Sequence, residues 1–204
     1  HGYYRTLQCF YNFLSKRNGY NNLMAAISPP RRKHKLPRIL TPDELDRLLS
    51  YPHRAEMKAL LVFLADTGAR VGEAVNLNPQ ALKQNSWGYV AAIEGKTGQR
   101  FVPIKAQTYY LLKENLPFPY NVDTLSHKVT QAFRDAGIKG SAHTLRHTFA
   151  TLWTGSEFAL QQILGHASFQ TLKIYRQMRM EYLCQQHEQF SPVHEFQQRK
   201  LEGF

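Results

Sequence analysis

The stretch RAEMKALLVFLADTGARVGEAVNL, residues 54–77, decides the expected architecture of the chain. Apolar residues recur in its first half at the three-to-four spacing of a helix, which predicts one helix from about Arg54 to Asp66. The expected apolar face of this helix comprises Met57, Leu60, Leu61 and Leu64. Gly68 interrupts the pattern, so a second, short helix is expected from Arg70 to Leu77.

Arg70 and Glu73 are the first candidates for chemistry. An arginine just after a glycine break lies at a helix start, where its side chain can reach outward. Glu73 follows three residues later, which is the spacing at which a carboxylate can hold that helix turn or a neighbouring cation. Taken alone, the two residues fit an exposed Arg–Glu pair of small energetic weight better than a functional site.

Other elements are expected on both sides of this stretch. Thr41, Pro42 and Glu44 have the composition of a helix start, with Thr41 as the cap and Glu44 completing a capping box. Tyr89–Ile93 and Arg100–Ile104 flank a glycine-bounded turn and predict a hairpin. Further helices are expected at 3–17, 123–136, 144–153, 157–164, 169–177 and about 182–189, with Gly137 and Gly165 as C-caps. The expected fold class is mainly α with a small antiparallel β-sheet (α+β).

Composition excludes several classes of protein. Hydrophobic residues make up 43% of the 204, enough to bury a core, so global disorder is not expected. No apolar run approaches the roughly 20 residues that span a bilayer, and the first residues do not resemble a signal peptide. Cys9 and Cys184 lack metal-ligand spacing and are expected to be reduced thiols of a cytoplasmic protein. No metal and no cofactor are expected.

Positive charge is concentrated at the start of the chain. Lysine and arginine total 26 against 15 acidic residues, for a formal net charge of +11. Residues 1–38 contain no acidic residue, so a polyanion would relieve the repulsion among their basic side chains, and nucleic acid is the usual one. Residues 28–38 are also rich in proline, which predicts an extended basic linker.

Three further motifs carry side chains suited to phosphate chemistry. Lys96 lies in the expected hairpin turn, where it is either simply solvated or able to protonate a leaving oxygen. His143 and Arg146 are three residues apart and share a helix face, so they can bind one phosphate, although this spacing also occurs by chance. Tyr175 follows His166 by nine residues on an expected helix, where half-buried packing is the usual role of a tyrosine.

Taken in order, these motifs resemble the tyrosine recombinase (phage integrase) family over roughly residues 37–178. Four stretches carry the resemblance: TGARVGEAVNL, GKTGQRFVPI, HTLRHTFATL and LGHASFQTLKIYRQM. The interval from Arg146 to His166 is slightly shorter than in many members. The resemblance implies the family's catalytic-domain fold at 39–178, the last helix of a truncated core-binding domain at 1–27 and an interdomain linker at 28–38. It leaves residues 179–204 as a tail that docks either on its own domain or on a neighbouring protomer.

The resemblance also implies a mechanism: cleavage and rejoining of DNA through a covalent 3′-phosphotyrosine at Tyr175, without metal or ATP. Two guanidiniums would bind the phosphate, His143 would accept the phenolic proton, and Lys96 would protonate the leaving 5′ oxygen. His166 would bond to the phosphate or support the tyrosine. Glu73 would orient the region of Arg70 and His143 without contacting the phosphate itself. The implied catalytic set is Arg70, Lys96, His143, Arg146, His166 and Tyr175.

The expected partners are double-stranded DNA and further copies of the chain, in a tetramer on DNA. The residues expected to contact DNA are Arg31, Arg32, Lys33, Lys35, Thr97 and Arg100. A cytoplasmic, nucleoid-associated protein of a bacterium, archaeon or phage fits this interpretation. Two alternatives remain open: a type IB topoisomerase-like enzyme, which would relax supercoiled DNA as a monomer, and a catalytically silent DNA-binding module, which would form no covalent adduct.

Overall fold

The structure, a computed structural model, describes residues 2–30, 37–95, 98–165 and 180–193. The chain forms two compact units, His1–Leu36 and Pro37–Phe204. The expected helix at 169–177 lies outside the described residues. So do eight of the candidate side chains: Arg31, Arg32, Lys33, Lys35, Lys96, Thr97, His166 and Tyr175.

The first unit consists of a helix and one short turn of helix. α1 runs from Gly2 to Asn18, as the sequence predicts, and η1 from Leu23 to Ala26. The Tyr4 hydroxyl donates to the Ile27 carbonyl, which ties the two ends of the unit together. Its apolar side chains are largely exposed, namely Tyr3, Leu7, Phe10, Phe13, Tyr20, Leu23 and Ile27.

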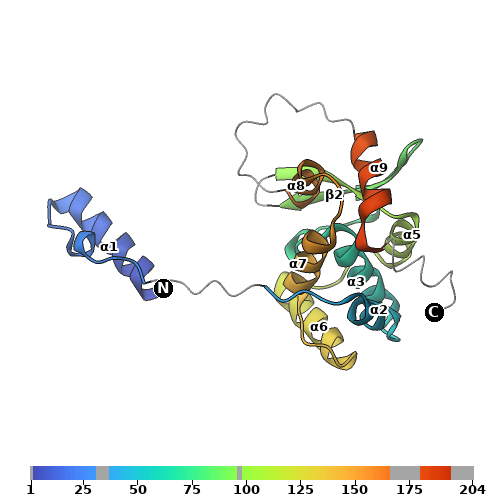
Figure 1. Ribbon diagram of the computed structural model, residues 1–204, viewed down its shortest axis with the longest axis horizontal. Helices are drawn as coiled ribbons and strands as arrows, with labels where there is room; N and C mark the ends of the chain where they lie inside the picture. The colour runs from blue at the N-terminus through green and yellow to red at the C-terminus, as the bar shows by residue number, and fades with distance from the viewer. Residues whose placement is uncertain (1, 31–36, 96–97, 166–179, 194–204) are drawn as a thin grey trace. The chain divides into compact units, whose positions relative to one another are not determined.

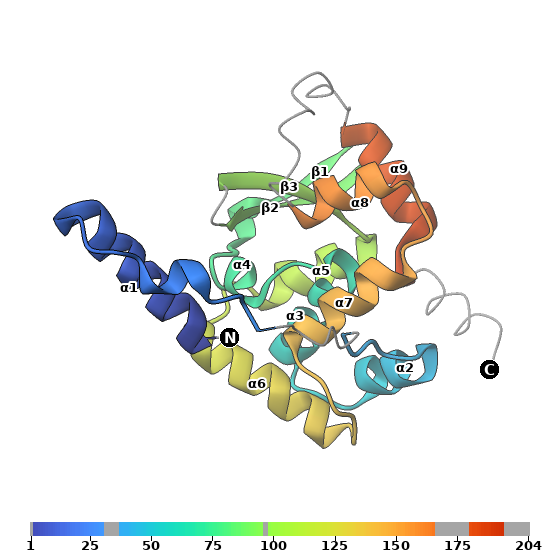
Figure 2. The same cartoon turned by 60° about the vertical axis from the view of Figure 1, so that its left-hand side comes forward.

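The second unit is a helical domain with a small sheet at one end and α2 and α6 at the other (Figures 1 and 2). Its elements are α2 (Pro42–Ser50), α3 (Ala55–Thr67), α4 (Val71–Val75), η2 (Pro79–Ala81), β1 (Leu82–Asn85), β2 (Gly88–Gly95), β3 (Gly98–Ile104), α5 (Ala106–Asn115), α6 (Val122–Asp135), α7 (Ala142–Leu152), α8 (Glu157–Leu164) and α9 (Met180–Phe190). Within the described ranges, none of the helices is long and apolar enough to cross a membrane.

The helix signals in the sequence are confirmed where they are local. Thr41 caps α2: its side chain accepts from the Glu44 N–H, and the Glu44 carboxylate accepts from the Thr41 N–H. Gly68 and Gly165 both end their helices in the left-handed conformation. α5 was not predicted, because its sequence AQTYYLLKEN has neither a side-chain cap nor a clear apolar stripe.

The sheet is a three-stranded antiparallel meander in the order β1-β2-β3. The register pairs Ile93 with Arg100 and Gly95 with Gly98, which confirms the expected hairpin. One face of the sheet points into the main core through Ala91, Val102 and other buried side chains. β1 was not predicted, because only the first residue of its sequence LKQN is buried. α9 packs against β2, β3 and α8 of the same chain (Figures 1 and 2).

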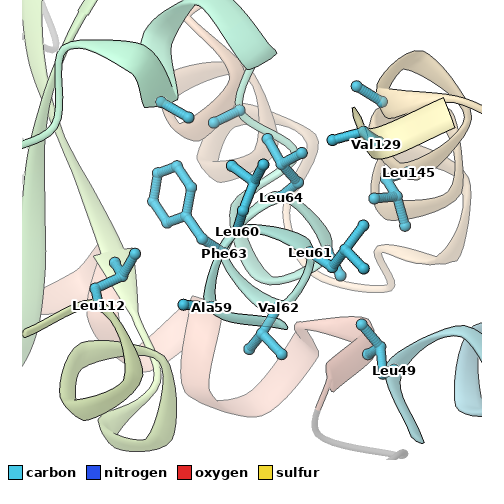
Figure 3. Close-up of a cluster of buried hydrophobic side chains, with 14 of the residues drawn as sticks. Leu49, Ala59, Leu60, Leu61, Val62, Phe63, Leu64, Leu112, Val129 and Leu145 are labelled. Carbon is cyan, nitrogen blue, oxygen red and sulfur yellow. The ribbon is translucent and has the colours of Figure 1, made fainter. Parts of the chain in front are cut away.

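α3 is the centre of the second unit. Every residue from Ala59 to Thr67 is buried, and the side chains of Leu60–Leu64 leave the helix in all directions (Figure 3). The expectation of a single apolar face was therefore wrong. A helix that packs against α5, α6, α7 and β3 at once needs apolar residues all round. Each fully buried leucine or phenylalanine here contributes about 1.5–3 kcal/mol by leaving water.

Asp66, near the end of α3, carries a fully buried carboxylate. Oδ2 accepts from the Lys105 N–H at 2.8 Å and from the Thr108 hydroxyl at 2.7 Å. Oδ1 accepts from the Ser191 hydroxyl and lies 3.1 Å from Nε2 of His187. Burial acts to raise the Asp66 pKa, but the His187 interaction and the hydrogen bonds outweigh it, so the pKa lies below its ordinary value. This carboxylate therefore joins α3 to the start of α5 and to the end of α9.

Replacing Asp66 by asparagine should lower the free energy of unfolding by about 3 kcal/mol or more, because the amide N–H₂ cannot accept the bonds that one carboxylate oxygen receives. Urea denaturation at pH 7 measures the change. The matched control is Asp135→Asn at an exposed position of α6, which should change stability by no more than about 0.5 kcal/mol. Equal losses in the two variants would contradict the role given to Asp66.

Candidate functional site

The turn Gly68-Ala69-Arg70 between α3 and α4 places the first candidate side chain. Gly68 has φ 61°, a conformation that favours glycine. A Cβ there would lie 2.7 Å from a ring carbon of Phe149 and 2.8 Å from a methyl of Leu164. The turn is therefore pressed against α7 and α8, and only glycine fits. Arg70 follows as the N-cap residue of α4, as the sequence predicts.

Glu73 is the carboxylate around which the site is arranged. Its side chain is only 4% exposed. Oε2 accepts from the Arg70 N–H at 2.7 Å and so closes the first turn of α4. Oε1 accepts from Nη1 of the Arg70 guanidinium at 3.3 Å. Glu73 thus holds both the helix turn and a neighbouring cation, the two roles that its spacing from Arg70 predicts. The Arg70–Glu73 pair is not fully exposed, because Glu73 is nearly buried.

Arg100 brings a second guanidinium to the same carboxylate. Arg100 lies two and four residues before the buried Val102 and Ile104 of β3. Residues at this spacing share one face of a strand, so the Arg100 side chain lies on the core face of the sheet. Nη1 donates to Glu73 Oε1 at 2.8 Å and Nη2 to Oε2 at 3.0 Å, a two-point contact. Nε donates to the Ile163 carbonyl at 3.1 Å. The sequence does not predict this partnership, and Arg100 was expected only among the DNA contacts.

Arg146 comes from α7 and is 8% exposed. Its Nη1 donates to the Gly68 carbonyl at 2.6 Å and its Nη2 to the Leu164 carbonyl at 3.0 Å. These two carbonyls belong to the break after α3 and to the last turn of α8. Arg146 therefore links three elements at the point where Arg70 begins α4.

The three guanidiniums leave the cluster with two positive charges in excess of the Glu73 carboxylate. Burial, followed by repulsion from Arg70, lowers the pKa of Arg146 to about 10. Arg146 is still charged at neutral pH. Burial acts to raise the Glu73 pKa, but hydrogen bonds from Arg100 and from the Arg70 N–H outweigh it and bring the pKa below its ordinary value. Because Arg100 and Arg146 are mostly buried, this excess of positive charge favours an anion as ligand.

The structure thus brings together Arg70, Glu73, Arg100 and Arg146 from α4, β3 and α7. His143 lies on the first turn of α7 and is exposed, whereas Arg146 on the same helix is turned inward. Among the described residues, the guanidiniums that bind the Glu73 carboxylate are those of Arg70 and Arg100. That Glu73 also orients His143 stays a prediction. Lys96, His166 and Tyr175 lie outside the described residues, so their places in the site also stay predictions.

Comparison with known proteins gives a consistent match. Residues 38–181 match the phage integrase family. Tyrosine recombinase XerD of Shewanella oneidensis is 31% identical over 220 residues, covering 92% of this chain and 73% of the relative. Tyrosine recombinase XerD of Oceanobacillus iheyensis is 29% identical over 219 residues, with the same coverage of both chains.

Solved structures with the same arrangement of elements include the integrase from mycobacterium phage Brujita, with a TM-score of 0.69 and 22% identity over 94% of this chain and 71% of that one. XerH site-specific recombinase in a pre-cleavage complex with its difH substrate gives a TM-score of 0.59 and 27% identity over 84% and 60%. A lambda integrase tetramer on a Holliday junction gives a TM-score of 0.62 and 17% identity, and the match covers 84% of this chain and 60% of that one. The likeness confirms the expected fold class.

Replacing Glu73 by glutamine should destabilise the protein by about 2–4 kcal/mol near pH 7, because the guanidiniums then lack a counter-charge. The folded pKa of Glu73 lies below the unfolded value of about 4.3, so the carboxylate stabilises the fold above that pH and loses this effect as pH falls through the folded pKa. The difference between wild type and variant should therefore shrink below about pH 4.

Urea denaturation of both proteins between pH 7 and pH 3 measures this difference, and every other titrating group cancels in the comparison. Glu157→Gln, at an exposed position in the first turn of α8, is the matched control and should cost little at any pH. A cost of Glu73→Gln that stays constant with pH would show that the charge of Glu73 is not what stabilises the cluster.

Proposed function

Because the chain belongs to the phage integrase family, we propose that it is a site-specific DNA recombinase that cleaves and rejoins DNA strands through a 3′-phosphotyrosine at Tyr175. The observation that carries the proposal is the set of guanidiniums of Arg70, Arg100 and Arg146 around one carboxylate. It supports binding of a phosphate, because three guanidiniums share one carboxylate, with Arg146 buried and Arg70 reachable from solvent.

Arg70 and Arg146 have complementary roles in this proposal. The Arg146 guanidinium is held by two backbone carbonyls, so its remaining N–H groups have a fixed direction before DNA binds. The Arg70 side chain is 48% exposed and can meet a phosphate from the solvent side. Two guanidiniums on the non-bridging oxygens would stabilise the charge that builds up as a fifth oxygen approaches phosphorus.

The remaining steps are assigned from the motifs. The Tyr175 phenolic oxygen attacks the phosphorus, and its proton passes to His143, which the structure leaves exposed on α7. The bond from phosphorus to the 5′ oxygen breaks, and Lys96 protonates that oxygen. His166 donates a hydrogen bond to the phosphate or supports the tyrosine. The reaction reverses when another 5′ hydroxyl attacks the phosphotyrosine, so neither ATP nor a metal enters the scheme.

Partners follow from the same proposal. XerH is solved with its difH substrate and lambda integrase as a tetramer on a Holliday junction, and we assign duplex DNA and a DNA-bound tetramer to this chain by analogy. Residues 1–27 and the linker at 28–38 would contribute to DNA binding. Within the tail at 179–204, α9 packs on its own domain in this structure, and docking of the tail on a neighbouring protomer remains the alternative. The proposed DNA contacts are Arg31, Arg32, Lys33, Lys35 and Thr97. Arg100 was expected among them, but all three of its guanidinium nitrogens bind protein groups, so we do not propose it as a DNA contact.

DNA crosslinked to the protein in cells supplies the target sequence, from which nicked duplexes are prepared. Wild-type protein incubated with these duplexes should form a covalent protein–DNA adduct that survives SDS. Tyr175→Phe should form none, since it lacks the attacking oxygen. Gel electrophoresis of labelled DNA measures both. Tyr110→Phe, at an exposed position on α5, is the control and should behave as wild type. An undiminished adduct with Tyr175→Phe would remove Tyr175 as nucleophile, and no adduct with wild type would favour a silent DNA-binding module.

Arg146→Lys should lose about 100- to 1000-fold in the rate of adduct formation, because an ammonium cannot reach two carbonyls and a phosphate oxygen together. Its affinity for the same DNA should change by no more than about 3-fold, since many other phosphate contacts share the binding. Single-turnover cleavage and a filter-binding titration measure the two quantities. Equal losses in affinity and rate would mean that Arg146 serves binding rather than the reaction.

A further inference from the structure

Arg100 uses all three of its guanidinium nitrogens inside the protein. Two of them hold the Glu73 carboxylate and the third holds the carbonyl of Ile163, in the last turn of α8. The side chain is 15% exposed, against 48% for Arg70. The guanidinium of Arg100 is therefore committed to protein groups, and its main action does not require contact with DNA.

The backbone closes around this ion pair from two sides. A Cβ at Gly95 would lie 2.8 Å from Glu73 Oε1 and 3.5 Å from Arg100 Nη1. A Cβ at Gly165 would lie 2.7 Å from the Arg100 guanidinium carbon. Both contacts are too close for any residue larger than glycine unless the ion pair moves. The Arg100–Glu73 pair is thus in direct contact with the end of β2 and with the residue that ends α8.

The proposed function gives a role to the residue that follows each of these glycines. Gly95 immediately precedes Lys96, and Gly165 immediately precedes His166. The last carbonyls of a helix lack partners within the helix, and here Arg100 and Arg146 supply partners to two of them, Ile163 and Leu164. The end of α8 is therefore located by arginines rather than by its own hydrogen bonds alone.

We propose that Arg100 is a positioning residue: through its contacts with Glu73, Gly95 and Gly165 it fixes the end of β2 and the end of α8 relative to Arg70. This proposal rests on the proposed function, because its purpose is to bring Lys96 and His166 to the phosphate that Arg70 and Arg146 bind. The Arg100 guanidinium would then determine where Lys96, the proposed general acid, and His166 enter the site.

The test variant is Arg100→Lys, which keeps the positive charge but loses the planar fork that reaches two carboxylate oxygens and a carbonyl at once. Arg134→Lys, at an exposed position of α6, is the matched control. The substrates are two nicked duplexes of identical sequence, one with the ordinary phosphodiester and one with sulfur in place of the bridging 5′ oxygen. A thiolate leaves without protonation, so the sulfur substrate does not need the Lys96 proton.

If Arg100 positions Lys96, Arg100→Lys should cleave the ordinary substrate about 100-fold more slowly, the effect of a misplacement of about 1 Å. On the sulfur substrate its deficit should shrink to about 10-fold or less, because the step that needs the general acid is bypassed. Arg134→Lys should match wild type on both. A deficit in Arg100→Lys that is equal on the two substrates, or absent from both, would overturn the positioning of Lys96.

A second readout does not depend on cleavage. The Gly165 N–H donates to the Gln161 carbonyl at 2.9 Å, and the Trp153 N–H donates to the Phe149 carbonyl at 3.1 Å in the corresponding place at the end of α7. In Arg100→Lys the Gly165 amide should exchange with deuterium about 10-fold faster and the Trp153 amide at the wild-type rate. Unchanged exchange at Gly165 would overturn the positioning of α8.

The two readouts separate the two claims. If wild-type protein forms no adduct with either substrate, the proposed function is wrong, whereas the exchange rate of Gly165 still decides whether Arg100 locates the end of α8. If wild type cleaves and Arg100→Lys shows neither the substrate-dependent deficit nor faster exchange, the proposed function stands and the role of Arg100 falls.

Discussion

The contact of one nearly buried carboxylate, Glu73, with the guanidiniums of Arg70 and Arg100 is the interaction on which the site depends. Three guanidiniums this close would repel one another in a place with little water. One carboxylate offsets part of that repulsion and leaves an excess of positive charge. The arrangement thus favours an anion while one carboxylate limits the repulsion, which is the combination a phosphate site needs.

The rest of the domain supplies fixed points for these arginines. α3 is buried on every side and ends at Gly68, whose carbonyl receives Arg146. Two residues earlier, Asp66 joins the same helix to α5 and to the end of α9. Because α9 also packs against α8 and the sheet, the elements that carry the arginines and their carbonyl partners belong to one connected structure.

Sequence reasoning succeeded where the signal was local and failed where it was not. The cap at Thr41, the break at Gly68 and the hairpin follow from residue types a few positions apart. The contact of Arg100 with Glu73 joins residues 27 apart, and no local pattern signals it. The all-round burial of α3 likewise depends on helices far along the chain, as does the unpredicted α5. The roles of Lys96, His166 and Tyr175 rest on the family resemblance, and these residues lie outside the described ranges, so the roles stay predictions.

The most direct measurement of the central claim is a crystal structure of the chain bound to duplex DNA. The account predicts that one backbone phosphate accepts hydrogen bonds from both Arg70 and Arg146, at the charge-assisted distance of about 2.7–2.9 Å. It also predicts that the Glu73–Arg100 contact is kept in the complex. A complex in which the two arginines bind different phosphates, or in which no phosphate enters the cluster, would contradict it.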